Sequence, residues 1–186
     1  MKIVQIVPRL ESGGVERGAI EVASSLIASG HEAVLISQGG RLVDEVVRVG
    51  ARHVLMSVAD KSIKVLGSLT TLKRWLEIER PDVIHPRSRL PAWLCWKIWK
   101  SMPVERRPGL VTSVHGLHSV NRYSSVISRG ERVEVVSRTA RQYLEDHYVV
   151  DPRDKVRVIH RGIDPNAYFP EYRPDQAWLD TWYRQW

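Results

Sequence analysis

The sequence predicts an α/β fold: an open, doubly wound and mostly parallel sheet of the Rossmann-like type, with helices on both faces, in a single domain. Strand-like and helix-like runs alternate along the chain, and glycine or proline stands where most runs end. The chain has 186 residues, of which 43% are hydrophobic. That length buries one good core and leaves no room for two full α/β domains.

Seven runs rich in β-branched residues are predicted to be strands, and six runs with helical spacing of apolar residues lie between them. Parallel strands joined by helices require right-handed crossovers, and such sheets bind ligands beyond the carboxyl ends of their strands. The residues just after each strand are therefore the ones to inspect. The expected strands are Lys2–Val7, Glu32–Ser37, Arg52–Met56, Asp82–His85, Leu110–Val114, Arg132–Ser137 and Val156–Ile159. The expected helices are Val15–Ser29, Arg41–Val49, Ser62–Arg80, Leu90–Lys100, Asn121–Ser128 and Thr139–Tyr148.

A glycine loop, with Gly13 and Gly14, connects the first strand to the first helix. Free N–H groups and the positive end of the helix dipole point out of such a turn, so it favours a phosphate-bearing ligand. A tight βα turn without a ligand is the alternative. The second strand ends in Ser37-Gln38, without the acidic residue that holds a ribose hydroxyl in dinucleotide sites, which disfavours a nicotinamide oxidoreductase.

Basic residues concentrate in one segment. Between His85 and Arg132 there are nine Arg or Lys residues against two Glu, an excess that equals the formal net charge of +7 of the whole chain. Arginine suits bidentate contacts to phosphate or carboxylate, although a bias in genome base composition would also enrich it. The segment has no recognisable nucleic-acid-reading motif, so nucleic acid is not an expected partner. The single cysteine, Cys95, fits a reducing cytoplasm.

Several short motifs occur in a specific order and spacing. With them the chain resembles the amino-terminal, acceptor-side domain of the GT-B glycosyltransferases of family 4, which build lipopolysaccharide, capsule and glycolipid sugars. The resemblance covers residues 1–170. The motifs are Gly13-Gly14-Val15-Glu16, Ser29-Gly30-His31-Glu32-Ala33, Asp82-Val83-Ile84-His85, Arg87-Ser88-Arg89, Thr112-Ser113-Val114-His115-Gly116, Val135-Val136-Ser137 and Val158-Ile159-His160-Arg161-Gly162-Ile163-Asp164.

The resemblance implies transfer of a sugar from a nucleotide-sugar donor to a glycan or lipid-linked acceptor, with retention at the anomeric carbon and no obligatory metal or other cofactor. It implies that Gly13 and Gly14 approach the donor phosphates and the reacting centre. It places His115 beside the donor sugar as the catalytic residue, with packing as the alternative role. His31 follows a helix-ending glycine, Gly30, so we expect it to have a structural role at the entry to the second strand. The residues that it places on the acceptor side are Arg87, Ser88, Arg89 and His118.

Two domain segments are expected, residues 1–164 as the amino-terminal Rossmann-like domain and 165–186 as a proline-punctuated linker with a Trp-rich amphipathic helix. Trp178, Trp182 and Trp186 recur at i, i+4 and i+8 and form an aromatic stripe. The stripe either folds back on this domain or docks the donor-binding, carboxyl-terminal half that family members carry. The chain is then the acceptor-side half of an enzyme, incomplete by itself, or a non-catalytic binding or regulatory module that docks a partner through the stripe.

The helix expected over Leu90–Lys100 mixes tryptophans and lysines. Projection at 100° per residue places Trp93 and Trp96 on one face with Lys97 and Lys100. Such a face is typical of contact with an anionic membrane surface, and cover from a neighbouring loop is the alternative. We therefore expect a cytoplasmic protein that either stays free or lies peripherally at the inner face of the membrane.

Overall fold

The computed structural model describes residues 1–58, 64–150, 155–163 and 173–185. Seven strands form one sheet in the order β3-β2-β1-β4-β5-β6-β7, and every neighbouring pair is parallel. This is the predicted doubly wound α/β fold, and each expected strand is present to within two residues at either end. The strands are β1 Lys2–Ile6, β2 Glu32–Ser37, β3 Arg52–Leu55, β4 Val83–Pro86, β5 Gly109–Val114, β6 Arg132–Val135 and β7 Val156–Val158.

The helices also follow the prediction, with one correction. The segment expected as a helix over Asn121–Ser128 is only a short 3-10 helix, η2, at Ser124–Ser128. The hydroxyls of Ser125 and Ser128 each donate to the carbonyl three residues earlier, and such side-chain bonds compete with the α-helical pattern. The expected start of the third helix, Ser62, lies outside the described residues. The helices are α1 Gly14–Ala28, α2 Val43–Arg48, α3 Lys64–Glu79, α4 Arg89–Ser101, α5 Arg138–His147 and α6 Gln176–Gln185, with a second 3-10 helix, η1, at Val104–Arg106.

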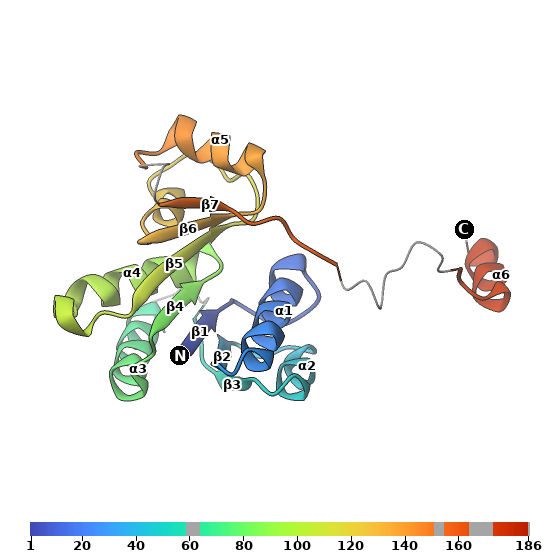
Figure 1. Cartoon of the computed structure of the whole chain (residues 1–186), viewed down its shortest axis with the longest axis horizontal. Coiled ribbons are helices and arrows are strands. Elements are labelled where there is room, and N and C mark those ends of the chain that lie inside the picture. Colours follow the sequence, from blue (N-terminus) through green and yellow to red (C-terminus); the bar gives the residue numbers. More distant parts are fainter. Residues whose placement is uncertain (59–63, 151–154, 164–172, 186) are drawn as a thin grey trace.

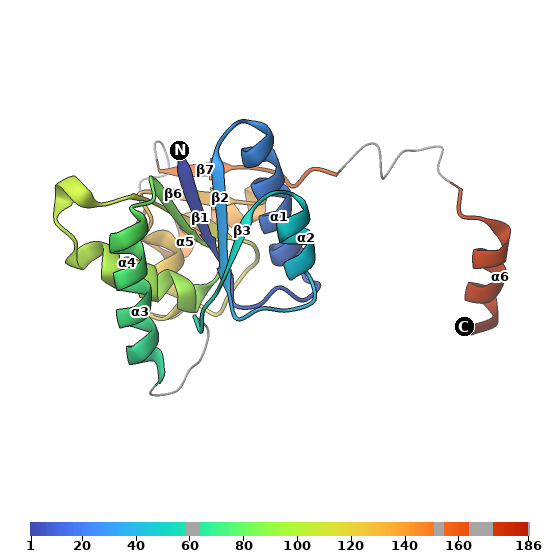
Figure 2. The same cartoon turned by 90° about the horizontal axis from the view of Figure 1, so that it is seen from below.

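Helices cover both faces of the sheet. Figures 1 and 2 show α1 and α2 together on one side of β1–β3, and α3 and α4 on the other. Side chains alternate along each strand, so Val4 and Ile6 face the core under α3 and α4, while Leu35 faces α1 and α2. A third cluster joins α4, η2 and α5 to the outer strands β6 and β7. These three clusters hold most of the buried apolar side chains of the described residues.

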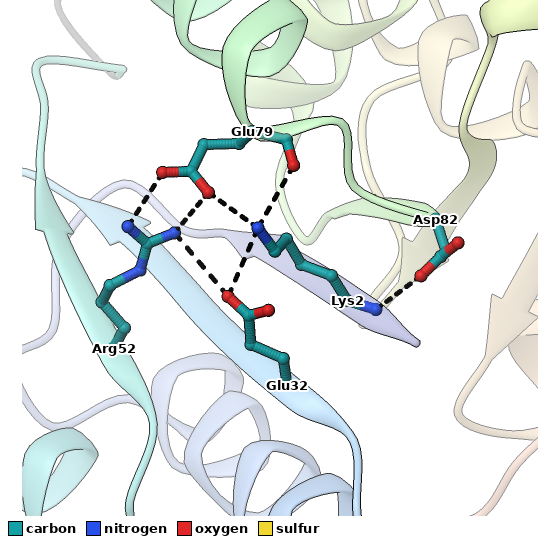
Figure 3. A network of polar contacts seen from close by, with 5 residues as sticks. All are labelled: Lys2, Glu32, Arg52, Glu79 and Asp82. Carbon is teal, nitrogen blue, oxygen red and sulfur yellow. Dashed lines mark hydrogen bonds and ion pairs between the residues drawn. The ribbon is translucent and has the colours of Figure 1, made fainter.

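The amino ends of the first three strands are fastened by an ion-pair network (Figure 3). Glu79, at the end of α3, accepts hydrogen bonds from Lys2 of β1 and from Arg52 of β3, while Glu32 of β2 pairs with the same two cations. The backbone N–H of Lys2 donates to Asp82, just before β4. This network joins the amino ends of four neighbouring strands, whereas the site was predicted at the carboxyl ends.

Helix α6 forms as the aromatic spacing predicts. The Trp178 and Trp182 rings stack with centroids 5.7 Å apart, and these side chains are 53% and 47% exposed. In both views α6 lies apart from the sheet (Figures 1 and 2). Trp186 and most of the proline-punctuated linker, including Pro165 and Pro170, lie outside the described residues.

Candidate functional site

The glycine turn lies at the point where the strand order reverses, between β1 and β4. Open α/β sheets bind ligands in the crevice at this switch point. Gly13 is the N-cap residue of α1, has extended backbone angles and provides no side-chain cap, and Gly14 is the first helical residue. Both glycines are exposed. The first N–H groups of this 15-residue helix lie at the turn, where the side chains of Glu16 and Arg161 approach the two glycines.

Below this turn, a buried arginine sits at the end of β4. Arg87 is 3% exposed, and its Nη1 donates to Oε1 of Gln5 in β1 over 3.0 Å. Gln5 is held in turn, because its Nε2 donates to the carbonyl of Ala19 in α1 over 2.8 Å. Burial lowers the pKa of Arg87, yet a guanidinium remains charged at neutral pH. A positive charge is thus fixed under the glycine turn by neutral partners.

His115 follows β5 and meets the chain that leaves β7. Arg161 donates from Nη2 to Nδ1 of His115 over 3.2 Å, and from Nη1 to the carbonyl oxygen of Gly14. Because Nδ1 accepts a hydrogen bond, the proton of the neutral ring must be on Nε2. Burial, together with the positive charges of Arg87 and Arg161, lowers the pKa of His115 to about 3. The side chain is therefore a neutral Nε2–H donor at physiological pH.

A polar rung crosses three adjacent strands beside His115. Ser113 of β5 donates to Glu134 of β6 over 2.7 Å, and His85 of β4 lies 2.5 Å from the Ser113 hydroxyl and 3.3 Å from the Glu134 carboxylate. Burial alone would raise the pKa of Glu134, but the hydrogen bonds from His85 and Ser113 and the charge of Arg87 lower it to about 2. Burial also lowers the pKa of His85. One ionised carboxylate thus lies near three basic side chains.

Three buried side-chain atoms in the described part of the chain have no hydrogen-bond partner: Oε2 of Glu16, Nε of Arg87 and Nε2 of His115. Buried polar atoms are almost always paired in native proteins, so each orphaned atom needs an explanation. All three lie around the first turns of α1. Glu16 folds back over Gly13, Arg87 reaches Gly18, and His115 is tied to Gly14 through Arg161. We call the surface around Gly14, Glu16, Arg87 and His115 the rim. The convergence of the three atoms marks the rim as the place where a polar ligand would supply the missing hydrogen-bond partners.

The other predicted acceptor-side residues lie on the η2 side of the same rim. Ser88 is the N-cap residue of α4. Arg89 donates to the Ser124 hydroxyl over 3.2 Å and stacks 5.3 Å from the Tyr123 ring centroid. The carbonyl oxygen of His118 accepts a hydrogen bond from Tyr143, and burial lowers the pKa of its imidazole. Among the described contacts, Ser88, Arg89 and His118 thus bond to their own neighbours and form no hydrogen bond with Arg87, His115 or Arg161.

The tryptophans of α4 are half-buried, in contrast to the exposed lysines beside them. The indole N–H of Trp93 donates to the carbonyl of Tyr123 over 2.8 Å, and the Arg129 guanidinium covers Trp96 at 4.3 Å from the ring centroid. Lys97 and Lys100 point away from the core and are exposed. The contacts of the two rings are those expected of cover by a neighbouring segment.

Across the described ranges, no helix is long and apolar enough to cross a membrane. Within the same ranges, no three His, Cys, Asp or Glu side chains gather closely enough to hold a metal ion.

Comparison with known families identifies the fold. The model of Glycosyltransferase Family 4 matches residues 12–167, which include the glycine turn and every strand after β1. The chain belongs to glycosyltransferase family 4. Among proteins with curated functions, none matches the chain in sequence.

Solved structures agree with the family assignment. A glycosyltransferase from Rickettsia africae is 32% identical, with a TM-score of 0.78; the match covers 99% of this chain and 48% of that one. HepE from Anabaena, solved with UDP and glucose, is 16% identical with a TM-score of 0.74, covering 100% and 50%. WaaG, a glycosyltransferase of lipopolysaccharide biosynthesis, is 11% identical with a TM-score of 0.67, covering 98% and 51%. This family 4 chain therefore spans about half the length of these GT-B enzymes and corresponds to their amino-terminal half.

Proposed function

We propose that this chain is the acceptor-side half of a retaining glycosyltransferase that moves a sugar from a nucleotide-sugar donor to a glycan or lipid-linked acceptor. The observation that carries the proposal is the convergence of three buried, unpartnered polar atoms on the rim around Gly14. HepE, a structural relative, was solved with UDP-glucose, which supports a nucleotide-sugar as the donor. The donor-binding half of the GT-B fold supplies the opposite wall of the cleft and most nucleotide contacts.

His115 is the proposed catalytic residue of this half. Retaining sugar transfer develops positive charge on the donor ring in the transition state. A cationic histidine would oppose that charge, whereas the structure holds His115 neutral with a free Nε2–H. That group donates a hydrogen bond to an oxygen of the donor sugar and so positions the ring. Gly13 and Gly14 let the donor phosphates approach the backbone, and the reaction uses no obligatory metal.

The acceptor side is formed by Arg87, Ser88, Arg89 and His118, which border the same rim from β4, α4 and the segment after β5. Arginine forks in this position favour an acceptor that carries phosphate or carboxylate groups. Such an acceptor is a sugar acid or a lipid-linked glycan.

A substitution tests the role of His115. In the assembled enzyme, with this chain and the donor-binding half together, we expect His115→Ala to lower turnover by about 100-fold or more, the typical effect of removing one catalytic hydrogen-bond donor. Thermal stability should change much less than turnover, because Nε2 has no partner among the described residues and the bond to Nδ1 comes from the exposed Arg161. His31→Ala, a half-buried histidine at the amino end of β2, is the matched control. Unchanged turnover in His115→Ala would refute the catalytic role.

A second candidate function is favoured by one observation, the exposed stripe on α6. Trp178 and Trp182 present stacked rings that are about half exposed. In this alternative the chain is a binding or regulatory module that docks a partner through the stripe. Replacing both tryptophans by serine separates the two functions: loss of association with the donor-binding half, together with loss of transfer, supports the enzyme, whereas intact transfer with loss of a different partner supports the module.

We also propose that the enzyme works in the cytoplasm and that α4 rests peripherally on an anionic membrane surface. The exposed Lys97 and Lys100 support the proposal, since two lysines near such a surface contribute about 2 kcal/mol. The rings of Trp93 and Trp96 beside them are half-buried, and the Lys100 ammonium lies 5.1 Å from the centroid of the Trp96 ring. Sedimentation with vesicles tests it. Binding to anionic vesicles alone, lost in a Lys97→Gln/Lys100→Gln variant, is expected, and equal binding to neutral vesicles contradicts the electrostatic contact.

A further inference from the structure

We propose that Arg87 and Arg161 form a binding site for one anionic group, a phosphate or a carboxylate, seated over Gly18 of α1. The inference rests on the proposed function and names the substrate group that the rim takes. A methyl group built on Gly18 would lie 3.5 Å from Nη2 of Arg87 and 3.3 Å from Nη1 of Arg161. The two nitrogens are therefore at most about 7 Å apart. Two oxygens of one anion span such a gap, because each charge-assisted hydrogen bond is about 2.8 Å long.

In the part of the chain that the structure describes, the hydrogen-bond partners of both guanidinium groups are neutral. Arg87 donates to the amide oxygen of Gln5, and Arg161 donates to the Gly14 carbonyl and to neutral His115. Among the described residues, no carboxylate oxygen forms an ion pair with either arginine. In addition, Nε of Arg87 is buried and has no acceptor. The two positive charges repel each other, and the buried charge of Arg87 has no counter-ion. An anion bound between the two guanidinium groups would relieve both the repulsion and the unpaired buried charge.

The surroundings suit a negative ligand. The site lies one turn into α1, where the helix dipole is positive, and the absence of a side chain on Gly18 leaves space between the arginines. The nearest carboxylates act on Arg87 only at longer range. Of these, Glu134 is already engaged by Ser113 and His85, and Glu21 is an exposed residue of α1. The remaining carboxylate of the first turn, Glu16, folds back over Gly13 and forms no ion pair with either arginine. The described residues thus supply two fixed positive charges over Gly18.

Titration of inorganic phosphate into the full 186-residue chain tests the site, with the backbone amide signals of Gly14 and Gly18 followed by NMR. Arg161→Gln removes one charge, and Gly18→Ala places a methyl group in the seat. We expect each to weaken phosphate binding about tenfold, the usual worth of one charge-assisted hydrogen bond. Both variants should keep the fold, because Arg161 is exposed and alanine favours a helix. Arg106→Gln, an exposed arginine of η1 before the amino end of β5, is the matched control.

Wild-type phosphate affinity in both Arg161→Gln and Gly18→Ala overturns the proposal, as does a failure of phosphate to perturb these glycines at all. Competition identifies the source of the anion. Displacement of phosphate by UDP supports the donor diphosphate, displacement by a free sugar acid such as glucuronate supports the acceptor, and displacement by neither overturns the assignment to a substrate group. These measurements need no sugar transfer, so their failure is distinct from a failure of the proposed enzymatic function.

Discussion

Replacing Glu79 by glutamine should remove the negative centre of the network in Figure 3. Oε2 of Glu79 lies 2.8 Å from Nζ of Lys2 and 2.8 Å from Nη2 of Arg52, and Oε1 accepts a further bond from Arg52 over 2.9 Å. A glutamine at this position would keep the shape of the side chain and one acceptor oxygen. The substitution therefore tests the charge of Glu79 and not its volume.

The size of the effect follows from the pKa of the carboxyl group. Hydrogen bonds from Arg52 and Lys2 lower the pKa of Glu79 from 4.5 to about 2. A shift of that size corresponds to about 3 kcal/mol if it is fully expressed. The Arg52 side chain is 45% exposed and that of Glu32 is 51% exposed, so water and salt screen the network. We therefore expect a loss of about 1 kcal/mol at neutral pH, or about 2–4 °C in Tm.

The dependence on pH has a definite sign. A carboxyl group with a lowered pKa in the folded state stabilises the fold at pH values above its unfolded pKa, here 4.5, and this stabilisation disappears as the pH falls toward about 2. In urea denaturation, the difference between wild type and Glu79→Gln should thus be largest near neutral pH and should shrink below 4.5. Glu77→Gln, on the same helix but 53% exposed and 3.9 Å from Lys73, is the control with a much smaller effect. Equal losses in both variants, or a loss independent of pH, would refute the reasoning.

Two further predictions concern Gly40 and His115. Gly40→Ala should destabilise the fold by about 2 kcal/mol or more, because Gly40 has φ of 138° and a Cβ there would collide with the backbone of Leu10. In the same thermal melts Gly67→Ala, in open space on α3, should not destabilise the fold. NMR of the imidazole nitrogens should show His115 as the neutral Nε2–H form from pH 7 down toward about 3; Arg161→Met should mix the two tautomers and raise the pKa, and a protonated His115 near neutral pH in the wild type would contradict the geometry.

The sequence was sufficient to predict the order of strands and helices, because local apolar patterns and glycine or proline breakers mark each element. Gly13 and Gly14 were predicted as site residues from the loop between the first strand and the first helix, and His115 from its place directly after the fifth strand. The prediction of an α-helix over Asn121–Ser128 was wrong, because only a 3-10 helix forms there. The hydroxyls of Ser125 and Ser128 bond to carbonyls three residues earlier, a competition that apolar spacing does not reveal. Sequence motifs thus predict the strands, the helices and the candidate residues, but they do not predict the hydrogen bonds that the side chains form.

The partners of the site residues were beyond sequence reasoning. Arg161 was noted only as a residue after the last strand, yet it contacts Gly14, which lies 147 positions earlier in the chain. Glu134 lies in the middle of β6 and reads as an exposed strand residue, although it faces Ser113 across the register of β5 and β6. The only available signal was the polar residue in each of three neighbouring strands. Recognising it requires the strand order, which sequence spacing does not give.

The position of Arg161 links the fold to the proposed chemistry. This residue lies on the chain that leaves the edge strand β7, but its guanidinium reaches back to the switch point between β1 and β4. Its two hydrogen bonds fix the tautomer of His115 and hold the glycine turn, and its positive charge lies close to that of Arg87. An anion that binds between the two arginines would therefore affect the hydrogen bonds that Arg161 donates to His115 and to Gly14. On this geometry, anion binding and the orientation of the His115 ring, the proposed catalytic group, are coupled through one side chain.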